Sequence, residues 1–349
     1  MKVAAKEFAI YNNERPKILL LGNGFNRIND NSSWNELLNS MRDEKFKFDA
    51  SIYDIPNGLK ASMLANGELK SKIEKYINKA KKENKLFKND DQLSNQLYYD
   101  FASLNFDYIL TTNYSYEIEL AISGKNELSN NKIYHMMKQY RNNPDRKYFL
   151  HTFNQTNNNE FSRDIWHIHG EYRKPSSIIL GQLYYGNLLS NYKNSLPKSY
   201  KSLEKNIINK EVTKIDNWIK AFIVGDVYIV GLGMDFAEVD LWWLLEEKFQ
   251  NKNRGKTYFY NPKEQAFDYQ NILKKNTNLV LDKYNINELH KIKDSKEYEK
   301  QITQAQCKKY LMEAYDVKYQ DLNYIPDKDH SYLDFYKLVL KDIESKLKN

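Results

Sequence analysis

The stretch Lys17–Arg27, KILLLGNGFNR, contains the pattern that decides the fold. Ile18–Leu21 is an apolar run too short for a helix, and it is typical of a buried strand in a parallel sheet. The run leads directly into Gly22–Gly24, where glycine permits a tight turn and a close approach of a ligand to the main chain. This stretch therefore predicts the first strand and turn of an α/β domain.

A helix signal follows the glycine turn. Ser33 and Glu36 stand three residues apart ahead of Leu37, which is the pattern of a capping box. A strand, a glycine turn and a helix N-terminus together favour phosphate, because unpaired amides and the helix dipole both attract an anion. A single Gly-x-Gly also occurs in ordinary β–α turns, so a nucleotide site and a plain structural turn both remain open here.

Composition limits the classes of protein. The 349 residues suffice for one large or two ordinary domains, and a hydrophobic content of 41% allows a buried core. No segment approaches the roughly 20 apolar residues of a membrane span, and the first residues lack the apolar core of a signal peptide. We therefore expect a cytoplasmic protein without membrane contact. The single cysteine, Cys307, excludes a disulfide framework and a cysteine zinc site within the chain.

The charge balance is basic but evenly distributed. The formal net charge is +7, and the lysines are interleaved with aspartate and glutamate along the chain. A nucleic-acid site is expected to concentrate basic residues on one face. The pattern therefore favours a solvated basic surface over nucleic acid as a partner.

A second strand is predicted at Phe106–Asn113, followed at once by a helix at Tyr116–Ile122. Thr112 and Asn113 fall at the carboxyl end of this strand, which is where parallel sheets bind ligands. Asn113 is thus a candidate site residue, although asparagine is also a good N-cap for a helix.

A pair of histidines stands in the segment Asp164–Gly170, DIWHIHG. Its alternation predicts that His167 and His169 share one face of a strand. No third ligand has convincing spacing, so we do not expect zinc. A histidine at a strand end before Gly170 suits a general base, and a hydrogen-bonded structural histidine is the alternative.

A second glycine turn follows the apolar strand predicted at Asp226–Gly231. The turn is GLGMD, and Asp235 with Glu238 is spaced as a capping box for a helix predicted at Phe236–Phe249. Asp235 is accordingly either a helix cap or part of a turn that faces a ribose or phosphate.

The remaining strands complete a doubly wound parallel sheet. Lys256–Tyr260 is a strand closed by Asn261, Val317–Leu322 is another strand, and Ser331–Leu347 is an amphipathic helix. Strands that alternate with helices predict a single Rossmann-like α/β domain over 1–349. We expect helical insertions near 42–105 and 181–220 and a polar insertion near 263–300.

The order of these motifs resembles the sirtuin-like NAD-consuming domains, in particular the zinc-free bacterial branch found in antiphage defence proteins. The resemblance covers about 17–261. It implies that Asn113 orients the attacking water and that His169 acts on a ribose hydroxyl or on water. It also implies a set of NAD-binding residues: Gly22, Asn23, Gly24, Phe25, Asn26, Thr112, Gly231, Gly233, Met234, Asp235 and Asn261.

The sequence departs from the protein-deacylating members of that family. It has one cysteine where their zinc module needs four, and Asn26 stands where they usually carry serine. The resemblance therefore implies an NAD hydrolase, which cleaves its substrate NAD into nicotinamide and ADP-ribose and needs no zinc. It also implies an antiphage abortive-infection effector that drains NAD, controlled by homo-oligomerisation or by an activator protein such as an ATPase encoded nearby. A catalytically idle nucleotide-binding scaffold subunit and an ADP-ribosyltransferase remain as alternatives.

Overall fold

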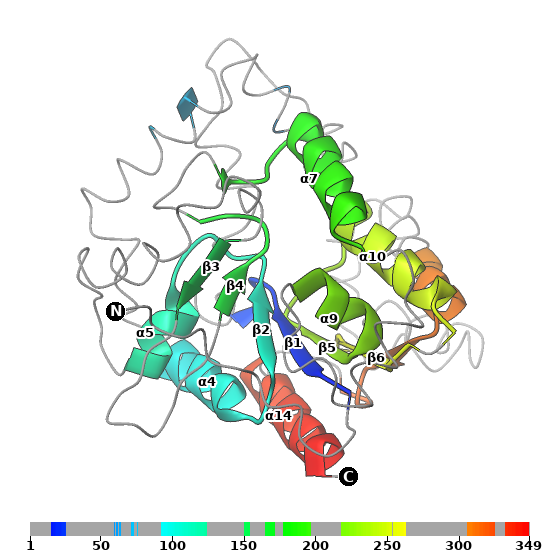
Figure 1. The fold of residues 1–349 in the computed structure, drawn as a ribbon. Coiled ribbons are helices and arrows are strands. Elements are labelled where there is room, and N and C mark those ends of the chain that lie inside the picture. The colour runs from blue at the N-terminus through cyan, green and yellow to red at the C-terminus, as the bar shows by residue number, and fades with distance from the viewer. Residues whose placement is uncertain are drawn as a thin grey trace, which may run out of the picture.

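The computed structural model contains one sheet with helices packed on both of its faces (Figure 1). Apart from single positions between 59 and 75, it describes residues 15–25, 92–123, 150–153, 165–171, 177–196, 218–252, 254–262, 306–324 and 332–348. Among the helices in these ranges, none combines the length and the apolar character that crossing a membrane requires.

The sheet has seven strands in the order β3-β4-β2-β1-β5-β6-β7. β3 pairs antiparallel with β4 at one edge, and all other neighbours pair parallel. The strands are β1 (Lys17–Leu21), β2 (Tyr108–Thr111), β3 (Leu150–Phe153), β4 (Ile165–His167), β5 (Asp226–Val230), β6 (Thr257–Tyr260) and β7 (Val317–Gln320).

The strand order reverses at β1, which confirms the predicted doubly wound fold. The chain proceeds outward from β1 through β2 to β4, then returns to place β5 on the other side of β1 and continues outward to β7. Ligands of doubly wound sheets bind at the carboxyl ends of the two strands where the order reverses. In this chain those strands are β1 and β5, and each is followed by one of the two glycine turns.

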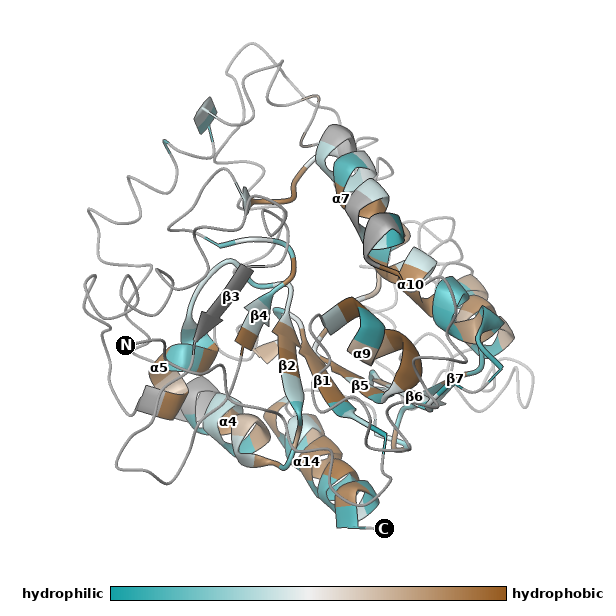
Figure 2. Ribbon diagram, viewed as in Figure 1, coloured by the Kyte–Doolittle hydropathy of each residue, from teal (hydrophilic) through white to brown (hydrophobic). Residues whose placement is uncertain are grey.

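Alternate side chains of β1 explain why a continuous apolar run forms the central strand. Leu19 and Leu21 pack into one core cluster, whereas Ile18 and Leu20 pack into the other. The first cluster lies beneath α4 (Gln92–Ser103), α5 (Glu117–Ser123) and α14 (Tyr332–Lys348). The second lies beneath α7 (Gln182–Ser195), α9 (Trp218–Val224) and α10 (Val239–Gln250). Figure 2 shows hydrophobic residues along the sheet and α9, and mixed residues along α14.

Several predicted element boundaries differ from the structure, and two of these differences have a local cause. α10 begins at Val239 and not at Phe236, because the Asp235 carboxylate accepts a hydrogen bond from the Ala237 amide and closes a turn first. β7 ends at Gln320 and not at Leu322, because Leu322 has a positive φ of 51°.

Parts of the predicted insertions can be compared with the structure. α4 lies in the region 42–105, and α7 lies in the region 181–220, whereas α9 begins at the end of that region and extends beyond it. The capping box of Ser33 and Glu36, residue Asn26 and the polar insertion near 263–300 lie outside the described residues.

A buried lysine joins the helices that precede and follow β5. The Lys248 ammonium donates to the carbonyl oxygens of Phe222 (2.9 Å), Ile223 (3.3 Å) and Gly225 at the C-terminal end of α9. These carbonyls have no partner within the helix, and a cation is favoured beside them. Burial lowers the pKa of Lys248 to about 7.

The two glycine turns pack directly against one another. The Gly22 amide donates to the Val230 carbonyl (3.0 Å), and the Gly24 amide donates to the Gly231 carbonyl (2.7 Å). A Cβ atom at Gly22 would lie 2.5 Å from the Gly231 carbonyl oxygen. Glycine is required there because two main chains occupy the space that a side chain would need.

We predict that Gly22→Ala lowers the free energy of unfolding by about 1–3 kcal/mol, because the added methyl group forces the two turns apart. Gly233→Ala is the matched control in the same pair of turns: its Cβ atom has nothing within 4 Å, so a change within about 0.5 kcal/mol is expected. Urea denaturation followed by circular dichroism measures both. Equal stability of the two variants would show that the turns are not in contact.

Candidate functional site

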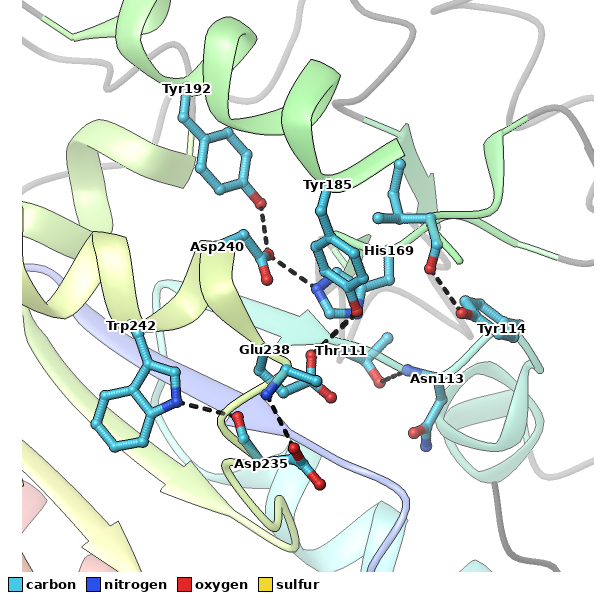
Figure 3. Close-up of polar contacts among 12 residues, drawn as sticks. Thr111, Asn113, Tyr114, His169, Tyr185, Tyr192, Asp235, Glu238, Asp240 and Trp242 are labelled. Atoms are coloured by element: carbon cyan, nitrogen blue, oxygen red, sulfur yellow. Dashed lines mark hydrogen bonds and ion pairs between the residues drawn. The ribbon is translucent and has the colours of Figure 1, made fainter. Parts of the chain in front are cut away.

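The predicted catalytic pair follows two adjacent strands. β2 and β4 pair in parallel with Thr111 opposite His167. Asn113 and His169 each stand two residues further along the chain, so they leave the carboxyl edge of the sheet at equivalent positions. Figure 3 shows the two residues in one region of the protein, together with side chains of α7 and α10.

Asn113 is held by hydrogen bonds and does not cap a helix. Its amide nitrogen donates to the Thr111 hydroxyl (3.1 Å), and its side-chain Nδ2 donates to the Tyr98 hydroxyl of α4 (3.2 Å). α5 begins only at Glu117, so the N-cap alternative does not apply. In Figure 3 the Asn113 side chain points away from the His169 imidazole.

The prediction that His167 and His169 share one face was wrong. β4 ends at His167, and a turn through Gly170, with φ of 90°, directs the next histidine elsewhere. His167 contacts Glu119 in α5, whereas His169 contacts Asp240 in α10, and these helices cover opposite faces of the sheet.

His167 is a buried imidazolium. Its Nδ1 lies 2.7 Å from the Asn113 carbonyl oxygen and its Nε2 lies 2.7 Å from Glu119 Oε1. Burial lowers the pKa of His167, but the charge and hydrogen bond of Glu119 outweigh it and raise the pKa to about 9. Both ring nitrogens therefore donate, and one of them fixes the main chain of Asn113.

His169 is fully buried and is bound on one side only. Its Nε2 lies 2.9 Å from Asp240 Oδ2, whereas its Nδ1 has no hydrogen-bond partner among the described residues. The Glu238 Oε2 atom lies 3.9 Å from this Nδ1. Burial lowers the pKa of His169, but the Asp240 and Glu238 charges outweigh it, so the pKa is raised overall.

Two tyrosines of α7 complete this cluster. Tyr185 and Tyr192 are seven residues apart, so they lie on one side of the helix. The Tyr185 hydroxyl donates to Glu238 (3.4 Å), and the Tyr192 hydroxyl donates to Asp240 (3.3 Å). Burial raises the pKa of Glu238 to about 7, the His169 charge opposes this, and neighbouring carboxylates add to it.

Sequence reasoning missed most of this cluster. It assigned Glu238 to a capping box, but the structure gives α10 no side-chain cap, and that carboxylate turns towards the histidine. Asp240 and the two tyrosines carried no motif. The available signal was the seven-residue spacing of the tyrosines in the helical insertion predicted near 181–220.

The predicted residues of the first glycine turn differ in their exposure to solvent. Asn23 and Gly24 are partly exposed at the turn. Phe25 is fully buried, with its ring centroid 5.0 Å from that of Tyr98 and 4.5 Å from that of Tyr336. Its side chain therefore supports the turn from the α4 and α14 side, and its assignment to NAD binding stays a prediction.

The second glycine turn is held from several directions. Gly231 has φ of 66°, and Met234, with φ of 47°, is buried. Gly233 is exposed, and its carbonyl accepts a hydrogen bond from Lys308 (2.7 Å), the neighbour of the exposed Cys307. The Asp235 carboxylate accepts from the Ala237 amide within the turn.

Two further predicted residues lie at strand ends. The Thr112 amide donates to the Leu21 carbonyl (3.2 Å), which joins the ends of β1 and β2. Asn261 follows β6, and its Nδ2 donates to the Tyr319 hydroxyl (3.0 Å). The structure thus brings Thr112 close to the first turn, whereas Asn261 stands two strands away from β1.

One group among the described residues has the composition of a metal site. His169, Glu238 and Asp240 each offer a ligand atom, and these atoms lie within 4.8 Å of one another. In the present arrangement the histidine Nε2 and an aspartate oxygen are at hydrogen-bond distance. The ion pair between His169 and Asp240 therefore already uses two of the atoms that a metal ion would need.

Comparison with known proteins supports the resemblance over part of the chain. The family model of the SIR2-like domain matches residues 107–212, which include β2, Asn113 and both histidines. Comparison with curated proteins gives no match. The matched segment is thus similar to a family of NAD-related enzymes, and it includes β2, β3 and β4 of the sheet.

We predict that the His167–Glu119 pair makes stability depend on pH. A histidine whose pKa rises from 6.5 to about 9 on folding stabilises the protein fully below pH 6.5, and this contribution is lost as pH rises through 9. The loss amounts to roughly 3 kcal/mol from the size of the shift. Urea denaturation of the wild type and His167→Gln at pH 6 and pH 9.5 measures it.

The difference between the two proteins isolates this pair from other titrating groups, such as Lys248. It is expected to be large at pH 6 and small at pH 9.5. If the difference stays constant with pH, His167 is not charged in the folded protein.

Proposed function

We propose that this protein is an NAD hydrolase that cleaves the bond between nicotinamide and ribose. The observation that carries the proposal is the position of Asn113 and His169 at equivalent ends of adjacent parallel strands, inside the segment similar to the SIR2-like domain. The strand-order reversal between β1 and β5 supports a dinucleotide as the ligand.

The two glycine turns would hold the pyrophosphate. They follow β1 and β5 and are joined by main-chain hydrogen bonds, so they present a rigid backbone surface at the reversal point. The Gly24 amide already donates to the Gly231 carbonyl. Binding would therefore use other main-chain amides of the turns, with the partly exposed Asn23 and the exposed Gly233 as the accessible positions.

Hydrolysis of the nicotinamide–ribose bond requires an oriented water molecule and a general base, and it has less need of a general acid. The C1′–N bond of NAD breaks through an oxocarbenium-like state, and nicotinamide leaves as a neutral molecule with the bonding electron pair. Water forms the new C1′–O bond and passes its proton to His169. Asn113 would orient this water after its amide exchanges the Tyr98 hydroxyl for it, while His167 keeps the main chain of Asn113 in place.

Burial of the pair supports control of the activity. His169 is covered by Tyr185 of α7, with the ring centroids 5.8 Å apart. The substrate would reach it after α7 moves away from α10. Self-assembly of the chain or an activator protein, such as an ATPase encoded nearby, would supply the energy for this movement.

We predict that the full-length protein converts NAD to nicotinamide and ADP-ribose and that Asn113→Ala or His169→Ala lowers the rate by about 10²–10⁴-fold, as expected for loss of a water-orienting group or a base. Chromatography of the products measures this, over a range of protein concentrations and with products of neighbouring genes added. Glu246→Gln, an exposed substitution on α10, is the control and is expected to match the wild type.

Other outcomes identify the alternatives. Tight NAD binding by calorimetry without turnover under any of these conditions would indicate a nucleotide-binding scaffold subunit. Transfer of radiolabel from NAD to a macromolecule would indicate ADP-ribosyl transfer. Variants that release nicotinamide at the wild-type rate would contradict the assigned roles.

A role in antiphage defence extends this proposal. An enzyme that drains NAD stops phage replication at the expense of the infected cell. In infected cells that express the wild type, we expect NAD to fall and phage yield to drop, and we expect neither with His169→Ala. Mass spectrometry of cell extracts and plaque counts measure the two effects. A normal phage yield with both proteins would contradict the defence role and leave the hydrolase activity to its own test.

A further inference from the structure

We propose that Asp240 is a positioning residue that keeps the His169 proton on Nε2 and leaves Nδ1 as the nitrogen that acts on the substrate. This inference rests on the proposed function and deepens it. It assigns a role to a carboxylate that lies outside the segment similar to the SIR2-like domain.

The first argument is the contact between the two side chains. His169 Nε2 and Asp240 Oδ2 are 2.9 Å apart, and both residues are fully buried. A carboxylate can only accept, so the Nε2 atom must carry the proton. A buried aspartate that accepts from one imidazole nitrogen fixes both the tautomer and the orientation of the ring.

The second argument is that Asp240 is itself held in place. Tyr192 donates to the same oxygen atom from α7, over 3.3 Å. Asp240 also lies in the first turn of α10, where the helix dipole stabilises a negative charge. The carboxylate is therefore held in place by α7 and by the N-terminal turn of α10, independently of its contact with the histidine.

The third argument is the environment of the other ring nitrogen. Nδ1 is buried and has no hydrogen-bond partner among the described residues, and Glu238 Oε2 stands 3.9 Å away. This separation is too long for a direct hydrogen bond, but a water or a ribose hydroxyl could bridge it. Among the described residues, Glu238 and Asp240 of α10 and the ring of Tyr185 of α7 lie against His169, and the Tyr192 hydroxyl of α7 donates to Asp240.

The chemical step balances with these groups alone. As nicotinamide leaves with the bonding electron pair, water attacks C1′ and its proton passes to Nδ1 of His169. The ring then carries a positive charge, which the Asp240 carboxylate stabilises through the Nε2 proton. Loss of the Nδ1 proton to solvent returns the neutral ring.

The tautomer is tested directly by NMR of the full-length protein with ¹⁵N-labelled histidine, with the His169 signals assigned from His169→Gln. Above the midpoint of its titration, wild-type His169 is expected to carry its proton on Nε2. In Asp240→Asn the proton is expected to move to Nδ1, because the asparagine amide can donate to Nε2. This measurement needs no enzymatic activity, so it stands even if the proposed hydrolase reaction fails.

Activity provides the second readout. Asp240→Asn is expected to lower kcat by about 10²–10⁴-fold with a nearly unchanged Kd for NAD. Tyr192→Phe, which leaves the aspartate in place, is expected to lower kcat by less than about 10-fold. The Asp240 charge raises the pKa of His169, so its removal in Asp240→Asn lowers that pKa. The acid limb of the residual activity should therefore lie at lower pH than in the wild type. Glu246→Gln is the matched control.

Three results would overturn the inference. The first is wild-type His169 with its neutral proton on Nδ1, which is decisive even if Asp240→Asn does not fold. The second is a folded Asp240→Asn with an unchanged tautomer and wild-type activity. The third is stoichiometric binding of Zn²⁺ or Mn²⁺ to the wild type that Asp240→Asn abolishes, because Asp240 would then be a metal ligand in the group with His169 and Glu238.

Discussion

The contact between two main chains at the carboxyl ends of β1 and β5 is the constraint on which the rest of the arrangement depends. The turns after these strands share hydrogen bonds, and a side chain at Gly22 or Gly24 would collide with backbone atoms of the other turn. This contact brings together segments that are two hundred residues apart in sequence. It also fixes the edge at which β2 and β4 deliver Asn113 and His169, because each strand is registered on its neighbour.

The sheet could be predicted because its inner strands, β2, β1, β5 and β6, are buried on both faces. A strand such as Ile18–Leu21 must then be apolar at every position, which gives a signal that depends only on local sequence. The positions of Asn113 and His169 followed from the same reasoning, since a polar residue directly after such a run falls at the carboxyl edge. The doubly wound sheet was predicted from strands that alternate with helices, and the observed strand order confirms it.

The partners of these residues could not be predicted, because they are set by tertiary contacts. Asp240 is 71 residues from His169, and Glu119 is 48 residues from His167. Which side chains become partners also depends on turns that move the start or end of a helix or strand by a few residues. The turn closed by Asp235 delays the start of α10, so Glu238 faces a histidine where its spacing suggested a cap. Similarly, the end of β4 at His167 separates two histidines whose alternation suggested one face.

The single thiol of the chain has a practical consequence. Cys307 is exposed, and it is the immediate neighbour of Lys308, whose ammonium group donates to the carbonyl of Gly233 in the second turn. Because there is 1 cysteine in the sequence, a maleimide fluorophore would attach at this position alone, without removal of other thiols. The native protein thus already contains an attachment point for an optical reporter next to the surface expected to receive the dinucleotide.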